Sequence, residues 1–293
     1  MVKSSAVSGP RYGEPLARHT TWRVGGPADV FYTPSDVADL AAFLRDYRGD
    51  TVVWLGLGSN VLIRDGGIRG AVIALAGGLS GLKWGDGSVH VQAGVPLAKV
   101  ARQCADRGLA GLEFFAGIPG TVGGALAMNA GASGSDTWSH VAAVETIDRQ
   151  GEIRVRPPAD FRVAYRSVEG PAQEWFVAAT FKLAEGDREE SRRRMKEHLA
   201  IRNRTQPMQT ANAGSVFRNP PGDFAARLIE TAGLKGWREG GAIVSLRHAN
   251  FIINEGQASA SDIERLIARV QLAVQERTGV FLEREVRIIG EQA

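Results

Sequence analysis

The chain has 293 residues, close to the size at which one hydrophobic core divides, so two or three domains are expected. Apolar residues make up 44% and charged residues 23%, which argues against a disordered or fibrous protein. The net charge is only +3, and the densest basic stretch, 192–204, lies among glutamates, so nucleic-acid binding is not expected.

Cysteine content and hydropathy set the expected compartment. The one cysteine, Cys104, allows no intramolecular disulfide, so nothing indicates an oxidising compartment. The first ten residues carry no apolar signal core, and no run of about 18 apolar residues occurs, so we expect a cytoplasmic protein with no membrane insertion. Glycine is enriched, since 36 of the 293 residues, about 12%, are glycine against a usual share of about 7%. This indicates many turns or close backbone approaches.

The first third of the chain predicts an α/β pattern. Strands are expected at 28–32, 51–55 and 71–75, where apolar residues run in short blocks. A helix with apolar residues at helical spacing follows Ser35, which is its expected N-cap.

The middle third continues this pattern around a glycine-rich stretch. Residues 113–136 contain too many glycines for one regular helix. Strands are expected at 89–93, 141–148, 152–155 and 175–183, and helices at 96–108 and 186–204.

The final third ends in the clearest helix of the sequence. Ser261 and Glu264 are expected to form its capping box and Gly279 to end it. Its predicted buried face consists of Ile263, Leu266, Ile267, Val270 and Val274. Before and after it we expect strands at 214–217, 242–246, 251–254 and 281–289 and a helix at 223–231.

A first glycine-rich loop, residues 56–61, directly follows a predicted buried strand. Its sequence Gly-Leu-Gly-Ser-Asn-Val offers bare backbone N–H groups and small polar side chains, which suit the diphosphate of a dinucleotide. A Rossmann fingerprint fails here, because its third glycine would fall at Val61 and a strand follows in place of a helix. Taken alone, an ordinary tight turn explains the loop equally well.

A second glycine-rich loop, residues 117–124, continues to residue 132. It lacks the Gly-Lys-Ser/Thr of a P-loop, so nucleotide hydrolysis is not indicated. A buried structural loop is the alternative interpretation. Two such loops in one α/β chain favour a large, extended cofactor, because each can approach a different part of it.

Three short segments hold a candidate proton donor and charged side chains: 165–167, 214–220 and 283–287. Spacing alone does not make them a site, because a serine beside glycine is usually a turn residue and an alternating charged strand is usually an exposed edge. The five histidines lie far apart without metal-ligand spacing, so no metal site is expected.

Taken in order, these segments resemble the family of UDP-N-acetylenolpyruvoylglucosamine reductases, also called UDP-N-acetylmuramate dehydrogenases, over nearly the whole chain. The short connection from 254 to 261 is similar to the second type of this family, which lacks an inserted tyrosine-bearing loop. The matching segments are 19–29, 56–61, 117–132, 165–167, 214–220, 232–237, 248–252 and 285–287.

The resemblance implies a mixed α+β and α/β fold, with a two-subdomain FAD-binding fold of the vanillyl-alcohol-oxidase type and a C-terminal α+β substrate-binding domain. We expect a first FAD-binding subdomain at 1–76, joined by the C-terminal strand 279–293. The second is expected at 77–204 and the substrate-binding domain at 205–278. The implied ligands are bound FAD, NADPH as cosubstrate and UDP-N-acetylglucosamine enolpyruvate as substrate. The oligomeric state stays open, with a monomer favoured.

The resemblance also implies residue roles. Arg166, Ser215 and Glu285 are the expected catalytic residues, drawn from distant stretches of the chain. The expected FAD contacts are Gly56, Leu57, Gly58, Ser59, Asn60, Val61, Gly120, Thr121, Gly123, Gly124, Asn129, Gly131, Ala132 and Arg202. The expected substrate contacts are Tyr165, Arg218, Asn219 and His248.

The implied reaction passes hydride from NADPH to FAD and then from reduced FAD to the enolpyruvyl methylene carbon, giving UDP-N-acetylmuramate for peptidoglycan. Negative charge then develops as an enolate, which Arg166 and a protonated Glu285 are expected to stabilise. Ser215 is expected to protonate the enolate carbon.

The sequence departs from the family pattern at Thr205, where the family commonly has lysine. Arg204 or Arg218 is the expected replacement as a phosphate-binding cation. Two other functions stay open, because fold does not dictate chemistry: an FAD-dependent alcohol oxidase and a non-catalytic nucleotide-binding module.

Overall fold

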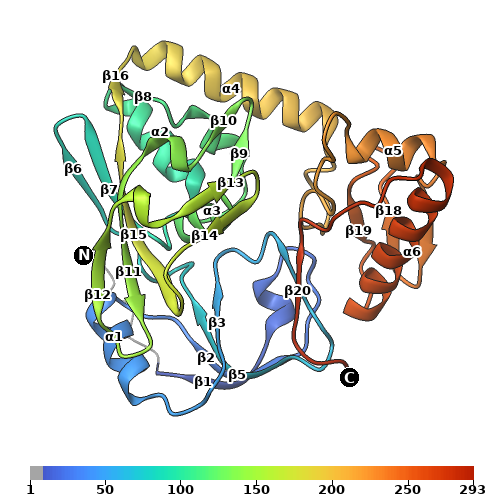
Figure 1. Cartoon of the computed structure of the whole chain (residues 1–293), viewed down its shortest axis with the longest axis horizontal. Coiled ribbons are helices and arrows are strands. Elements are labelled where there is room, and N and C mark those ends of the chain that lie inside the picture. The colour runs from blue at the N-terminus through green and yellow to red at the C-terminus, as the bar shows by residue number, and fades with distance from the viewer. Residues whose placement is uncertain (1–8) are drawn as a thin grey trace. The chain divides into compact units, whose positions relative to one another are not determined.

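Residues 9–293 are described by a computed structural model, in which the chain divides into two units (Figure 1). Unit 1 contains residues 9–12, 30–57 and 70–200, and unit 2 contains residues 13–29, 58–69 and 201–293. Each unit is therefore assembled from separated stretches of sequence. The expected division into three domains stays a prediction.

The largest sheet of unit 1 has five antiparallel strands in the order β12-β11-β15-β7-β6. Helices α2 (Leu97–Asp106) and α3 (Val122–Met128) bury one core together with this sheet. The strands are β6 Leu82–Gly85, β7 Ser88–Gln92, β11 Val141–Asp148, β12 Ile153–Arg156 and β15 Glu174–Lys182.

A second core in unit 1 forms around α1 (Val37–Asp46), β3 (Val52–Leu55) and β5 (Ile68–Ala74). Strands β3 and β5 pair in parallel within a sheet of order β1-β2-β5-β3, where β1 is Arg11–Pro15 and β2 is Pro27–Tyr32.

The expected cap of helix α1 was wrong. Asp36 is the N-cap and accepts the Asp39 N–H, while the Ser35 hydroxyl donates to the Asp39 carboxylate. A carboxylate one residue further along thus replaced the serine, because it accepts the free N–H with a full negative charge.

Short elements and one long helix complete unit 1 and lead into unit 2. Helix α4 is long and charged, as expected, and its last residues belong to unit 2. These elements are β8 Leu109–Ala110, η2 Glu113–Gly117, β9 Gly131–Ala132, β10 Ser135–Asp136, η3 Trp138–His140, η4 Pro158–Asp160, β13 Arg162–Ala164, β14 Ser167–Glu169, β16 Ala184–Glu185 and α4 Arg188–Thr205.

Unit 2 packs two helices on a three-stranded sheet of order β17-β18-β19 (Figure 1). The predicted face of helix α6 is buried in this core, which confirms the 3.6-residue periodicity, and Trp22 and Leu62 from the N-terminal third join it. The elements are η1 Leu16–His19, β4 Val61–Ile63, α5 Ala225–Thr231, β17 Arg238–Glu239, β18 Ala242–Val244, β19 Ile252–Asn254, α6 Ala260–Thr278 and β20 Arg287–Ile289.

The capping box expected at the start of α6 was wrong by two residues. Ser259 is the N-cap and forms the box with Asp262. The hydroxyl and N–H of Ser261 donate to Asp65 instead, at 2.8 and 2.9 Å, and Glu264 accepts from the Arg64 guanidinium. Gly279 ends the helix with φ 74°, as expected.

Two expected strands also differ. Residues 214–217 form no strand but a single bridge, Phe217 opposite Arg284. The terminal strand is shorter than expected, and β20 pairs in parallel with β4. Among residues 9–293, no helix combines the length and apolar character needed to cross a membrane.

Candidate flavin and substrate site

The first glycine-rich loop meets the second inside unit 1. A Cβ atom added to Gly56 would lie 2.6 Å from Oγ1 of Thr121, so these two residues are already in contact. Thr121 is buried and caps α3 by accepting the Gly124 N–H. Because the loops touch, one extended ligand can reach both.

The remainder of the first loop, 58–61, belongs to unit 2 and is braced by the segment before β2. Gly58 has φ +63°, and an added Cβ would lie 2.1 Å from the carbonyl oxygen of His19. The backbone N–H and hydroxyl of Thr21 both donate to the Gly58 carbonyl, at 3.1 and 3.2 Å. Only glycine satisfies both the dihedral angle and the space here.

The second loop has room for a large cofactor at some glycines and not at others. A Cβ added to Gly123 would lie 3.0 Å from that of Ala93, so packing against the core explains this glycine. Gly124 is exposed, and its added Cβ would only touch Oγ1 of Thr121 at 3.7 Å. Bare backbone at Gly124 beside the exposed Leu57 loop therefore fits the approach of an FAD molecule.

Arg166 is held by the second loop, within unit 1. It lies in the turn between β13 and β14 with φ +55°, which costs about 1–3 kcal/mol for a residue other than glycine. Its guanidinium donates to the carbonyls of Asn129 and Gly131, at 3.3 and 2.9 Å, and lies 5.1 Å from the centroid of the exposed Tyr165 ring. Strain together with a fixed guanidinium is typical of a functional position.

Ser215 and Glu285 belong to neighbouring segments of unit 2. The Glu285 N–H donates to the carbonyl of Val216 at 2.8 Å, directly after Ser215. Asn60 of the first loop also contacts the Glu285 segment, because its side-chain amide donates to the Glu285 carbonyl at 3.2 Å. The structure thus brings together Ser215, Glu285 and part of the expected flavin loop, while Arg166 is in the other unit.

The other expected ligand contacts in unit 2 have structural partners. Burial lowers the pKa of Arg202, whose Nε donates to the Gln206 side chain at 2.8 Å. Arg218 lies 3.8 Å from the Glu283 carboxylate. The side-chain oxygen of Asn219 accepts the Ala225 N–H at the start of α5.

The surroundings of His248 favour the neutral form of its imidazole. Burial lowers its pKa, and the nearby Lys235 ammonium lowers it further. Its Nδ1 is buried with no hydrogen-bond partner among the described residues, and its ring packs edge-on against Phe251. A neutral imidazole can donate or accept one hydrogen bond at a substrate.

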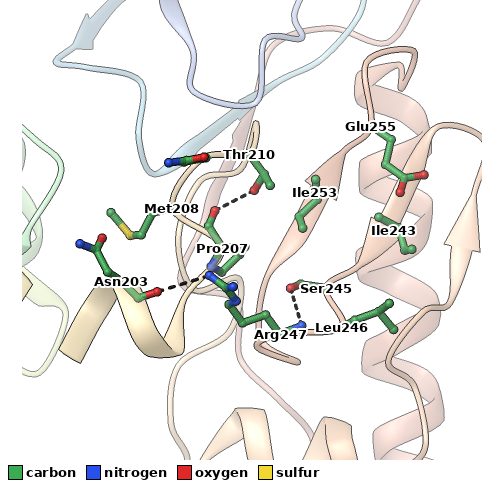
Figure 2. Close-up of a pocket in the computed structure, with 11 residues that line it drawn as sticks. Asn203, Pro207, Met208, Thr210, Ile243, Ser245, Leu246, Arg247, Ile253 and Glu255 are labelled. Carbon is green, nitrogen blue, oxygen red and sulfur yellow. Dashed lines mark hydrogen bonds between the residues drawn. The ribbon is translucent and has the colours of Figure 1, made fainter. Parts of the chain in front are cut away.

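A pocket of about 710 Å³ lies in unit 2 between residues 203–210 and strands β18 and β19 (Figure 2). Arg247 joins its two sides by donating to the carbonyls of Asn203 and Gln206, both at 3.3 Å. None of the expected site residues is among those that line it, and no sequence motif indicated it. The lining residues are Asn203, Pro207, Met208, Gln209, Thr210, Ile243, Ser245, Leu246, Arg247, Ile253 and Glu255.

Known proteins resemble this chain over nearly its whole length. Residues 28–155 match a family profile described as FAD binding domain, and residues 206–289 match UDP-N-acetylenolpyruvoylglucosamine reductase, C-terminal domain. The UDP-N-acetylenolpyruvoylglucosamine reductases of Alkalilimnicola ehrlichii and Methylococcus capsulatus are 58% and 57% identical, over 96% and 95% of this chain and 95% and 92% of their own.

A solved structure supports the same conclusion. The crystal structure of UDP-N-acetylenolpyruvylglucosamine reductase from Thermus caldophilus is 36% identical, with a TM-score of 0.80, and the match covers 96% of this chain and 98% of that one. The expected fold is therefore confirmed: an FAD-binding fold of the vanillyl-alcohol-oxidase type followed by a C-terminal α+β domain.

Proposed function

This chain belongs to the UDP-N-acetylenolpyruvoylglucosamine reductase family, and from that premise we propose that it reduces UDP-N-acetylglucosamine enolpyruvate to UDP-N-acetylmuramate with NADPH as electron donor. It is an FAD-binding oxidoreductase. The observation that carries the proposal is the hydrogen-bonded pairing of the Ser215 segment with the Glu285 segment, beside the first glycine-rich loop. We further expect a cytoplasmic monomer, and both properties stay predictions.

FAD, once bound and reduced by NADPH, supplies the hydride that reaches the methylene carbon of the enolpyruvyl group. The substrate carboxylate then carries the developing enolate charge, which needs donors that bind the transition state more strongly than the substrate. We assign Arg166 to this charge, because its position is fixed by the Asn129 and Gly131 carbonyls and a guanidinium can bind a carboxylate through two parallel N–H groups.

Ser215 completes the reaction by giving its hydroxyl proton to the enolate carbon. A serine hydroxyl is a weak acid, so it can act only against a strongly basic carbon and only when it is well positioned. We assign Glu285, in protonated form, to the enolate oxygen as a second hydrogen-bond donor. The hydrogen bond from the Glu285 N–H to the carbonyl of Val216, at 2.8 Å, holds the two segments together and supports joint action of Ser215 and Glu285.

Stopped-flow absorbance of the flavin tests these roles by separating its reduction by NADPH from its reoxidation by the enolpyruvyl sugar nucleotide. We expect Ser215→Ala to keep the rate of flavin reduction near that of the wild type and to slow reoxidation by about 100- to 10,000-fold, the usual contribution of a positioned proton donor. Ser261→Ala is the matched control, because its hydroxyl bonds Asp65 at the start of α6. Equal slowing of both steps by Ser215→Ala would remove the assigned role.

The same measurement separates the alternative functions. An alcohol oxidase would be reduced by an alcohol and reoxidised by oxygen, with no response to the enolpyruvyl sugar nucleotide. A non-catalytic module would show no flavin bleaching with NADPH.

A further inference from the structure

We propose that Asn250 is a positioning residue for the proton donor, and that its side-chain amide sets where the Ser215 hydroxyl lies. This inference rests on the proposed function, since it gives Asn250 a role through Ser215. Asn250 is only 3% exposed, and the sequence resemblance attached no role to it.

The side-chain amide of Asn250 makes two hydrogen bonds to the backbone of Phe217, two residues after Ser215. Its oxygen accepts the Phe217 N–H at 2.9 Å, and its nitrogen donates to the Phe217 carbonyl at 2.8 Å. The backbone carbonyl of Asn250 also accepts the Val216 N–H at 2.9 Å. The side chain and backbone of Asn250 thus make three hydrogen bonds to Val216 and Phe217. They pair with this segment as a neighbouring β-strand would.

The opposite edge of the same segment is held by the residues around Glu285. The Val216 carbonyl accepts from the Glu285 and Val286 N–H groups, at 2.8 and 3.3 Å. All four backbone polar groups of Val216 and Phe217 are therefore hydrogen bonded, and both residues are buried. The segment that carries Ser215 is fixed between Asn250 on one edge and Glu285 on the other.

The other flank of Ser215 is a glycine turn, in which the Gly214 N–H donates to the Asn212 side chain at 2.9 Å. Gly214 has φ +75°, a conformation that favours glycine, and an added Cβ would meet nothing within 4 Å among the described residues. The hydrogen-bonded backbone of Val216 and Phe217 thus fixes the chain directly after the serine, and through it the amide of Asn250 helps to set where the hydroxyl lies.

Asn250→Asp tests the inference with almost no change in shape. One carboxylate oxygen can still accept the Phe217 N–H, but the other faces the Phe217 carbonyl and repels it. A displacement of about 1 Å in a catalytic group can cost about 100-fold in rate. We expect flavin reoxidation by the enolpyruvyl sugar nucleotide to slow by about 10- to 100-fold, with reduction by NADPH within about 2-fold of the wild type.

Asn254→Asp is the matched control. Asn254 is also buried in unit 2, and its amide donates to the Trp22 carbonyl at 2.9 Å, away from the Ser215 segment. We expect this variant to unfold at lower urea concentration while the ratio of its two flavin rates stays at the wild-type value. A similar change of that ratio in both variants would overturn the inference, because any buried amide would then have the same effect.

A double-mutant cycle decides whether Asn250 acts through Ser215. If it does, Asn250→Asp combined with Ser215→Ala will reoxidise within about 3-fold of Ser215→Ala alone, because the hydroxyl that Asn250 positions is already gone. If instead the fold-losses in reoxidation rate of the two single variants multiply in the double variant, the two residues act independently and the inference is overturned. If Asn250→Asp yields no FAD-bound protein, Asn250→Gln, which keeps the amide and lengthens the side chain, enters the same cycle.

The outcomes also separate this inference from the proposed function. Slow reoxidation in Ser215→Ala with a normal rate in Asn250→Asp would overturn only the role of Asn250. A normal rate in Ser215→Ala would overturn the proton-donor assignment and, with it, the positioning role.

Discussion

Comparing Gly58→Ala with Gly13→Ala should separate two energetic costs that glycine avoids in the first loop: the cost of a positive φ and the cost of a steric clash. Gly58 and Gly13 share φ +63° and both belong to unit 2. A Cβ on Gly13 meets nothing within 4 Å among the described residues, whereas one on Gly58 would lie 2.1 Å from the His19 carbonyl oxygen. Gly13→Ala therefore reports the dihedral cost alone, about 1–2 kcal/mol.

Gly58→Ala adds a steric cost to the dihedral cost. The loop or the 19–21 segment must move by about 1 Å, which weakens the two hydrogen bonds from Thr21 to the Gly58 carbonyl, at about 1 kcal/mol each. Overpacking of this kind costs about 1–3 kcal/mol. The free energy of unfolding should therefore fall by about 2–4 kcal/mol more in Gly58→Ala than in Gly13→Ala.

FAD binding provides the second readout. If the loop must return to its native position to bind FAD, a 2 kcal/mol penalty raises the FAD dissociation constant roughly 30-fold. Urea unfolding of the apoprotein and titration of flavin fluorescence measure the two effects. The reasoning is refuted if Gly58→Ala matches Gly13→Ala in both measurements, because the contact with His19 would then have no energetic consequence.

Arg166→Lys cannot keep both carbonyl bonds in a planar fork, so flavin reoxidation should slow about 100-fold or more while reduction by NADPH persists, as stopped-flow traces will show. Asp65→Ala removes three hydrogen bonds at the start of α6 and should lower the free energy of unfolding by about 2–4 kcal/mol in urea, and an unchanged midpoint would contradict this. Because the pKa of His248 is lowered in the folded state, the unfolded state binds the proton first, and stability is lost as pH falls below about 6.5. The free energy of unfolding of His248→Gln should therefore fall less than that of the wild type between pH 8 and about 5. If the two free energies of unfolding fall in parallel with pH, His248 does not have a lowered pKa in the folded state.

Local patterns of the sequence determined the elements whose cause is local. The apolar face of α6 follows from 3.6-residue periodicity, and its end at Gly279 follows from the left-handed conformation that glycine adopts most easily. The first glycine-rich loop was also identified from its residues alone, and its glycine at position 58 does have a positive φ.

The helix caps show where local reasoning failed. At α1 and α6 several serine and acidic side chains lie within a few residues, and each can accept a free N–H group. At α6 the choice depended on Asp65, which is 196 residues from Ser261 in sequence and occupies its N–H and hydroxyl. No local pattern contains that information.

The candidate site depended even more on tertiary structure. The sequence identified Ser215 and Glu285 only through resemblance to a family, and it did not indicate that Asn250, 33 residues beyond Phe217, holds the serine segment in place. Periodicity and turn chemistry act over one or two turns of chain, so they determine what each segment can become. Which segments become neighbours is decided by burying apolar side chains while pairing every buried N–H and carbonyl, and only the folded chain satisfies both conditions at once.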